Sequence, residues 1–339
     1  MKADPMYPMA IAPFGPDGGG NSLASSKCML CHLAIVFIAF LAASASASAA
    51  TAGGFRVDCN DGFGYVPAHR HPFGGGTVAD SATVDRSAYI ENTAFVCSGA
   101  RVSGNARVMG TALVAGAAIV KDNAAVAGNA RVFGSAVISG SARVFGGANV
   151  AGNASVGGQA RVLDSARITG SAVIDGKATV SGNTAVFDRA RISGDAVVDG
   201  FAQVHDSAVV QDQARVVGSA IVRGVSTVAD RGRVFESALV QDGTVSGDSW
   251  IYGNAEVLGG SSVSGNAWVY GFAAVSGSVV DGNAWIEGAL VKSCRISGNA
   301  WLEPRITCVD SRICSPGADV GETQPVTLQN VNLGCPETQ

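Results

Sequence analysis

Residues 124–144 read AAVAGNARVFGSAVISGSARV, and this stretch decides the fold. Val126, Val132 and Ile138 stand six residues apart, and an alanine precedes each of them by two positions. The same phase holds without exception at 28 consecutive aliphatic positions in residues 78–240. Glycine or aspartate usually follows two residues later, and asparagine often comes next. The repeating unit is therefore A-x-V-x-G-N.

Chain geometry explains this unit. In A-x-V the two side chains leave an extended strand on the same face, because they lie two positions apart. Glycine, aspartate and asparagine tolerate positive φ and turn the chain before the next short strand. Three such sides close one coil of 18 residues. The pattern predicts an all-β fold, a single-stranded parallel β-helix (solenoid) of about 13 coils with capped ends.

The phase slips near the end of the array. Each slip is by one residue, and we expect each to be a shortened corner. The slips fall at Val245, Val280, Val291 and Ile296, and the last unit ends at Leu302.

Composition agrees with a repeat and excludes several classes of protein. The chain has 45 Gly, is 47% hydrophobic and only 15% charged, so it is not intrinsically disordered. No three-residue glycine period runs through it, which excludes collagen. The formal net charge of −4 gives no overall basic field, so we expect no nucleic-acid partner.

The repeat divides the chain into four segments. An apolar run over residues 29–50 follows Lys27 and ends in Ala-Ser-Ala triplets, which is typical of a secretory signal. The alternative is an uncleaved membrane anchor, which would be the chain's only membrane contact. Either interpretation places the protein outside the cytoplasm: secreted, periplasmic or on the cell surface. The segments are a signal peptide or anchor (1–50), an N-terminal cap (51–76), the β-helix (77–302) and a cysteine-containing C-terminal cap or tail (303–339).

Six cysteines remain after this signal, and they lie at or near the ends of the array. An even number in an oxidising compartment indicates disulfides, which would staple the caps. We expect one bridge between Cys59 and Cys97 and a second between Cys308 and Cys314. Cys294 occupies an inward small position and is expected to be a buried thiol. The candidates are Cys59, Cys97, Cys294, Cys308, Cys314 and Cys335.

The register resembles the hexapeptide-repeat family, the left-handed parallel β-helix of acyltransferases and γ-class carbonic anhydrases, as a bacterial-type variant with A-x-V-x-G-N units. The resemblance covers residues 78–302 and implies a left-handed helix. Here glycine comes one residue later than in the usual family pattern. Because acyltransferases of this fold use a histidine as general base, the resemblance implies His205 for that role. The carbonic anhydrase zinc site needs three converging histidines, which the repeats lack.

Sorting residues by the 18-residue coil places every tryptophan on one face. With the neighbouring tyrosines and arginines they form a candidate interaction surface, the Arg/Trp stripe. Such a stripe either stabilises the wall by stacking or binds a partner, namely a polysaccharide or another solenoid. The stripe comprises Arg143, Arg161, Arg215, Arg233, Trp250, Tyr252, Trp268, Tyr270, Trp285 and Trp301.

Other motifs give weaker signals. Cys28-Met29-Leu30-Cys31-His32 matches the c-type haem pattern but lies in the predicted signal, so no cofactor is expected. His69 and His71 are neighbours in the N-terminal cap and are expected to form a polar loop, so no metal site is predicted.

No nucleophile–base–acid constellation appears in the repeats. The sequence therefore favours a secreted or surface-exposed, non-enzymatic β-solenoid that is a structural or adhesive element. The first alternative is a hexapeptide-type acyltransferase with His205 as base. The second is a glycan- or ice-binding protein, although an ice-binding plane needs regular threonines and its column holds only Thr83, Thr227 and Thr244.

Overall fold

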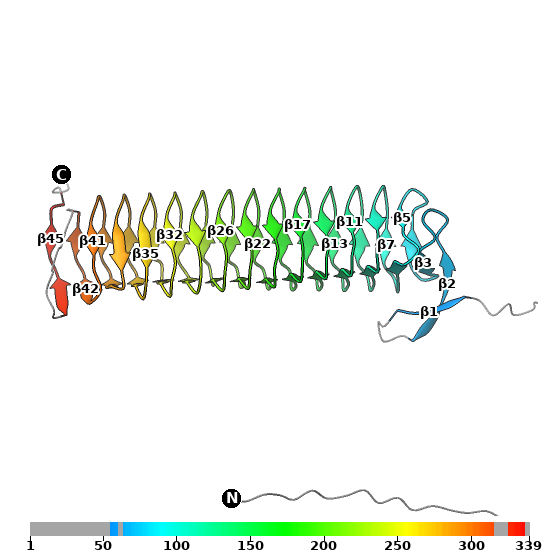
Figure 1. Ribbon diagram of the computed structural model, residues 1–339, viewed down its shortest axis with the longest axis horizontal. Helices are drawn as coiled ribbons and strands as arrows, with labels where there is room; N and C mark the ends of the chain where they lie inside the picture. The colour runs from blue at the N-terminus through cyan, green and yellow to red at the C-terminus, as the bar shows by residue number, and fades with distance from the viewer. Residues whose placement is uncertain (1–54, 60–63, 315–324, 336–339) are drawn as a thin grey trace, which may run out of the picture. The chain divides into compact units, whose positions relative to one another are not determined.

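The computed structural model describes residues 55–59, 64–314 and 325–335. These residues form strands and no helix, so the predicted all-β solenoid is confirmed (Figure 1). From Thr77 onwards, neighbouring coils pair through parallel strands, for example Arg131 with Asn149. Three sheets form the three faces of a stack of about 14 turns. The predicted signal or anchor, with Cys28, Cys31 and His32, lies outside the described residues.

The sheet of the first face also includes the two strands of the N-terminal cap segment. β1 and β2 join it in antiparallel orientation, and all later strands are parallel. Its strands are β1 (Arg56–Asp58), β2 (Tyr65–Arg70), β3 (Thr77–Ala79), β6 (Phe95–Val96), β9 (Leu113–Val114), β12 (Arg131–Val132), β15 (Asn149–Val150), β18 (Arg167–Ile168), β21 (Ala185–Val186), β24 (Gln203–Val204), β27 (Ile221–Arg223), β30 (Leu239–Gln241), β33 (Glu256–Leu258), β36 (Ala274–Ser276), β39 (Leu290–Lys292), β42 (Ile306–Val309) and β44 (Val326–Gln329).

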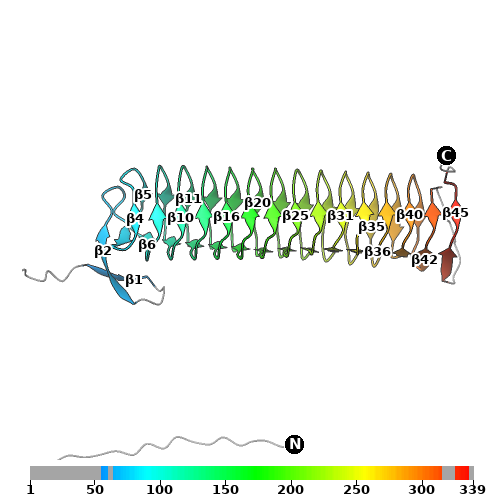
Figure 2. The same cartoon turned by 180° about the vertical axis from the view of Figure 1, so that it is seen from behind.

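The second face is a wholly parallel sheet, which Figure 2 shows from β4 to β45. Its strands are β4 (Thr83–Val84), β7 (Arg101–Val102), β10 (Ile119–Val120), β13 (Val137–Ile138), β16 (Ser155–Val156), β19 (Val173–Ile174), β22 (Arg191–Ile192), β25 (Val209–Val210), β28 (Thr227–Val228), β31 (Thr244–Val245), β34 (Ser262–Val263), β37 (Val279–Val280), β40 (Arg295–Ile296), β43 (Arg312–Ile313) and β45 (Asn332–Leu333).

The third face is also parallel and carries the Arg/Trp stripe. Its strands are β5 (Tyr89–Ile90), β8 (Arg107–Val108), β11 (Ala125–Val126), β14 (Arg143–Val144), β17 (Arg161–Val162), β20 (Thr179–Val180), β23 (Val197–Val198), β26 (Arg215–Val216), β29 (Arg233–Val234), β32 (Trp250–Ile251), β35 (Trp268–Tyr270), β38 (Trp285–Glu287) and β41 (Trp301–Leu302).

The interior is formed mainly by the alanine and the valine or isoleucine of the repeat units. These side chains are almost completely buried and form one continuous cluster along the stack. Strands of two residues suffice because each inward aliphatic residue packs on its equivalents in the coils on either side.

The corners depend on residues with positive φ. Gly146 has φ +73°, and an added Cβ would lie 2.8 Å from the backbone nitrogen of Asp164, the equivalent corner residue of the next coil. Where aspartate replaces glycine at a corner, its carboxylate accepts a backbone N–H from the next coil: Asp122 Oδ2 lies 2.9 Å from the nitrogen of Gly140. Corner aspartates therefore join successive coils.

The phase slips are shortened corners, as predicted. At three of them the inward residue, which is Gly243, Ser278 or Cys294, donates its N–H to the hydroxyl of a buried serine one coil earlier. The Ser278 hydroxyl donates to the carbonyl of Ser276 at 2.7 Å and accepts the N–H of Cys294 at 3.0 Å. Ser261, which lies at a corner of full length one coil earlier, donates to the carbonyl of Leu258 at 2.6 Å and accepts the N–H of Ser278 at 3.3 Å.

The parallel ladders continue beyond residue 302, where the sequence repeat ends. β42 pairs with β39 and β44 with β42 on the first face, while β43 and β45 extend the second face. At the other end β1 and β2 extend the first sheet, and the predicted bridge between Cys59 and Cys97 is confirmed.

Two predictions about the C-terminal cysteines are wrong. Cys308 bonds Cys294 rather than Cys314, and Cys314 bonds Cys335. Cys308 points inward from β42, opposite Val291, which brings it beside the inward Cys294 of the preceding corner. Cys294 is therefore half of a disulfide and not a free thiol.

Candidate functional site

The structure places the whole Arg/Trp stripe on the third face. Residues 18 or 17 apart in sequence lie directly opposite each other in neighbouring strands: Arg143 with Arg161, Arg215 with Arg233, and Trp250 with Trp268. No helix that could cross a membrane occurs among the described residues. The stripe therefore lies on a wall built entirely of short strands.

The aromatic part of the stripe is a double ladder. The rings of Trp250 and Trp268 stack with centroids 5.2 Å apart, and those of Trp268 and Trp285 with centroids 5.0 Å apart. Tyr252 and Tyr270 stack beside them at 5.0 Å and meet the tryptophans edge to face. Each such contact contributes about 0.5–1.5 kcal/mol beyond area burial, so the ladder also stabilises the wall.

The Tyr270 hydroxyl donates to Glu287 Oε2 at 3.0 Å across adjacent coils. Burial, followed by this bond and the negative charge of Glu287, raises the pKa of Tyr270 to about 12. Burial and the carboxylates of Glu287 and Glu236 also raise the pKa of Tyr252. Both tyrosines are therefore neutral hydrogen-bonding groups across the physiological pH range.

Trp301 lies at the end of the ladder. Trp285 and Trp301 are 42% and 47% exposed, and no ring stacking joins these two described residues as it joins the earlier ones. With Asn283 and Asn299 they line a groove of about 400 Å³. The Asn283 amide donates to Asn299 Oδ1 at 3.0 Å, so the two amides are held in a row beside the rings.

The arginine part of the stripe ends where the aromatic part begins. The Arg233 guanidinium lies over the Trp250 ring, 4.4 Å from its centroid, in a cation–π contact. Arg143, Arg161 and Arg215 are exposed, and none of the ion pairs found among the described residues involves them. They present free positive charge on this face.

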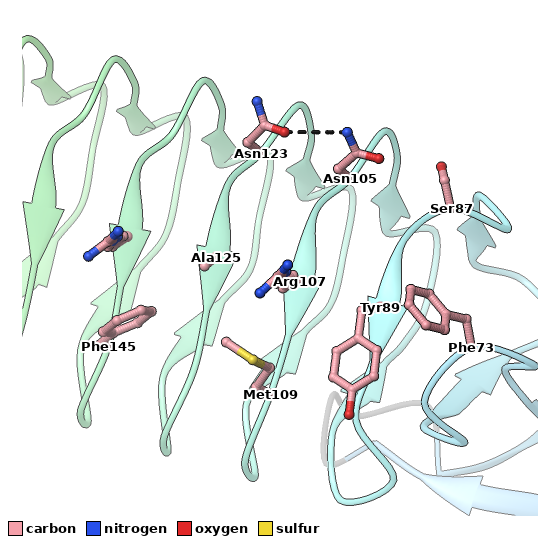
Figure 3. Close-up of a pocket in the computed structure, with 10 residues that line it drawn as sticks. Phe73, Ser87, Tyr89, Asn105, Arg107, Met109, Asn123, Ala125 and Phe145 are labelled. Carbon is pink, nitrogen blue, oxygen red and sulfur yellow. Dashed lines mark hydrogen bonds between the residues drawn. The ribbon is translucent and has the colours of Figure 1, made fainter.

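A larger hollow, of about 730 Å³, lies at the N-terminal end of the same face. Ala125 sits between Arg107 and Arg143 in register, and its methyl group leaves space between the two long side chains. Figure 3 shows Met109 and Phe145 along one side of the hollow, and Asn105 and Asn123 along the other. We call this hollow the N-terminal groove.

The N-terminal groove was not predicted from the sequence. Phe73, from the cap segment between β2 and β3, closes one end and meets the Tyr89 ring edge to face at a centroid distance of 5.1 Å. The 18-residue register already placed Arg107 beside Ala125, and this alternation of a long and a short side chain could have indicated a hollow. The repeat pattern did not show where the cap would fold.

His205 lies elsewhere, on the first face. Its ring stacks on Phe187 with centroids 4.6 Å apart, and its Nδ1 is 3.3 Å from Asp206 Oδ2. This carboxylate neighbour of His205 was not identified from the sequence. The N–H of Gly224 donates to Asp206 at 2.9 Å, and this bond is the main cause that lowers the pKa of the Asp206 carboxyl.

Asp188 joins this pair, and one ligand atom from each of Asp188, His205 and Asp206 lies within 4.8 Å of the others. Both carboxylates already accept backbone N–H groups of the next coil, from Asp206 and Gly224. These hydrogen bonds are the ones that corner aspartates make elsewhere in the stack. The cluster is therefore part of the corner structure.

The cap histidines do not converge. His69 is exposed and its Nδ1 lies 2.9 Å from Asp80 Oδ1. His71 is buried and its Nε2 bonds the carbonyl of Ala88 at 3.0 Å. Burial lowers the pKa of His71. The two rings thus have separate, structural partners.

Six-residue sides, three faces and an 18-residue register define this chain as a hexapeptide-type parallel β-helix by its own geometry. No protein-family model and no curated protein matches the sequence. Among solved structures it is similar to UDP-N-acetylglucosamine O-acyltransferase from Moraxella catarrhalis, with 15% identity, 46% of this chain and 70% of that chain covered, and a TM-score of 0.29. It is also similar to UDP-N-acetylglucosamine acyltransferase from Campylobacter jejuni, with 14% identity, 48% and 70% covered, and a TM-score of 0.31.

Proposed function

We propose that this chain is a secreted or surface-exposed, non-enzymatic β-solenoid that adheres to polysaccharide through its third face. One observation carries the proposal: the two grooves described above both lie on this face, and both combine aromatic rings with a row of asparagine amides. Sugar rings have apolar C–H faces and a rim of hydroxyls. Aromatic rings bind the former and amides bind the latter.

The ladder supports this function by fixing the binding groups in place. Trp250, Trp268 and Trp285 hold one another by stacking, so ordering them costs a ligand little conformational entropy. Trp285 and Trp301 expose enough ring surface to contact a ligand. The stacked strands of the wall and the buried side chains behind them give this surface a rigid support.

The disulfides support the proposed location. All six cysteines of the described residues are bonded, in three bridges near the ends of the stack. Such bridges persist in oxidising compartments and not in the cytosol. Secretion can be tested directly by recovering the processed chain from the culture medium or cell wall.

The binding test uses the full chain and sedimentation with insoluble cellulose and chitin. Wild type is expected to sediment with at least one of them, and the double variant Trp285→Ala/Trp301→Ala to lose at least tenfold in affinity. Trp268→Ala is expected to lower stability by about 2–3 kcal/mol, because this half-buried ring stacks on both sides.

Phe272→Ala is the matched control, because Phe272 is a 79% exposed aromatic residue that lines neither groove. It should bind as wild type does. Full retention of binding by the Trp285/Trp301 variant, with unchanged thermal stability, would overturn the proposal for this end of the face.

A second candidate function is acyl transfer with His205 as general base. The observation that favours it is the Asp206 carboxylate at Nδ1, which would orient the ring and leave Nε2 to accept a proton. Titration of the full chain with coenzyme A tests it. Binding that His205→Gln abolishes, together with thioester turnover, would replace the adhesive function by the enzymatic one.

A further inference from the structure

We infer that the N-terminal groove selects carboxylated polysaccharides through Arg107 and Arg143. This inference rests on the proposed function, because it names the class of glycan that the third face takes. It concerns a groove far along the stack from the tryptophan groove, and different residues carry it. The two sites can therefore be tested separately.

The spacing of the two arginines comes from the register. Arg107 pairs with Ala125, and Ala125 pairs with Arg143, so the arginines are two coils apart. Coils repeat at the strand spacing, so the two side chains leave the wall about 10 Å from each other. The small alanine between them leaves room for a ligand group that contacts both guanidinium groups.

The charge of the groove is uncompensated. Arg107 and Arg143 are exposed, and no ion pair among the described residues involves them. No aspartate or glutamate lines the groove. The nearby Glu91 carboxylate accepts the N–H of Gly110 at 2.7 Å, and that of Asp122 accepts the N–H of Gly140. Both carboxylates are hydrogen-bonded to backbone N–H groups and form no ion pair with Arg107 or Arg143. The two guanidinium groups therefore favour an anionic ligand.

Guanidinium geometry identifies the anion. An arginine presents its donors in a planar fork that matches a carboxylate in a bidentate contact, and it stays charged at every physiological pH. Two such forks on one strand column can bind two carboxylates of one polymer or flank a single one. Either arrangement requires a ligand with acidic groups.

The other residues of the groove favour a ligand that has an apolar surface and hydroxyl groups as well as a negative charge. Tyr89, Met109 and Phe145 offer apolar surface on one side of the arginines, and Asn105 donates to Asn123 at 3.4 Å on the other (Figure 3). A sugar ring with a carboxylate uses all three kinds of group. An inorganic anion would leave the aromatic side empty.

The experiment measures binding of polygalacturonate oligomers and their full methyl esters to the full chain by calorimetry. The methyl ester is the matched ligand, since it keeps the sugar chain and removes the charge. Wild type should bind the acid form at least tenfold more tightly, and this preference should fall as salt is added. Arg107→Gln and Arg143→Gln should each weaken binding of the acid form roughly tenfold, the loss expected for a charge-assisted hydrogen bond.

Arg131→Gln is the control variant. It removes the same charge as the other two variants, but Arg131 is exposed on the first face. It should bind the acid form as wild type does. Equal binding of acid and ester, or equal losses in all three variants, would overturn the selectivity inference and leave adhesion at the tryptophan groove intact. Absence of binding to any glycan, cellulose and chitin included, would overturn the proposed function itself.

Discussion

The coils before residue 240 and the coils after it turn their corners in different ways. In the earlier coils, glycine or aspartate with positive φ stacks directly on its equivalent in the next coil, as Gly146 does on Asp164. In the later coils, several corners lose one residue, and at some of them a buried serine of the preceding coil accepts the N–H of the inward residue, as Ser278 does from Cys294. The third face changes at the same place, from arginine to tryptophan.

This difference teaches that one interior tolerates two kinds of corner. The inward aliphatic residues remain fully buried on both sides of residue 240. The regular corner is fixed by backbone stacking, which requires glycine-like conformations. At three of the short corners, the N–H of the inward residue is also bound by the hydroxyl of a buried serine one coil earlier.

The largest effect is expected from adding a methyl group at a stacked corner. Gly146→Ala should lower the free energy of unfolding by about 3 kcal/mol, because strain at positive φ adds to the clash with the next backbone. Gly260 has φ +77° and no atom within 4 Å of the added methyl, so Gly260→Ala should cost only about 1 kcal/mol. Urea unfolding measures both, and equal losses would show that stacking contributes nothing.

A smaller effect separates a buried hydroxyl that has a hydrogen-bond partner from one that has none. Ser278→Ala leaves the N–H of Cys294 without a partner and should cost about 1–2 kcal/mol. Thr184 lies at a regular corner, and its buried hydroxyl has no hydrogen-bond partner. Thr184→Val should therefore stabilise the chain by about 1 kcal/mol. Destabilisation by both variants in thermal melts would contradict the distinction.

The smallest effect concerns ionisation in the aromatic coils. Because the pKa of Tyr270 in the folded chain is about 12, above the usual tyrosine value of about 10, its neutral form contributes stability that is complete below pH 10. This contribution is lost as the pH rises from 10 through 12. Absorbance titration should show a tyrosinate step near pH 12 that Tyr270→Phe removes. If the variant leaves every step in place, the ring does not have the environment described here.

The repeat made the interior and the faces predictable. Because one phase runs through the array, each residue's face follows from its position alone, and all four tryptophans fall on the predicted wall. The cysteine pairing at the C-terminus was not predictable in this way. The repeat pattern ends at Leu302, so the sequence did not show that Cys308 still occupies an inward strand position opposite Val291.

The His205–Asp206 pair was missed for a different reason. Neighbouring residues in an extended strand point to opposite faces, so strand alternation alone would keep these two side chains apart. Asp206 instead has φ +60°, as a corner residue, and this conformation turns its carboxylate back towards the ring. A side chain that follows a corner cannot be placed by strand alternation.

The short corners also determine which coil pairs with which. In the regular region every coil offers its neighbour the same alanine and valine columns, so a shift of the chain by one whole coil would keep the interior packing nearly unchanged. The same shift in the later coils would separate Cys294 from Cys308 and move Ser278 away from the N–H it caps. The irregular end therefore sets a unique alignment for a stack whose regular part is almost translationally symmetric.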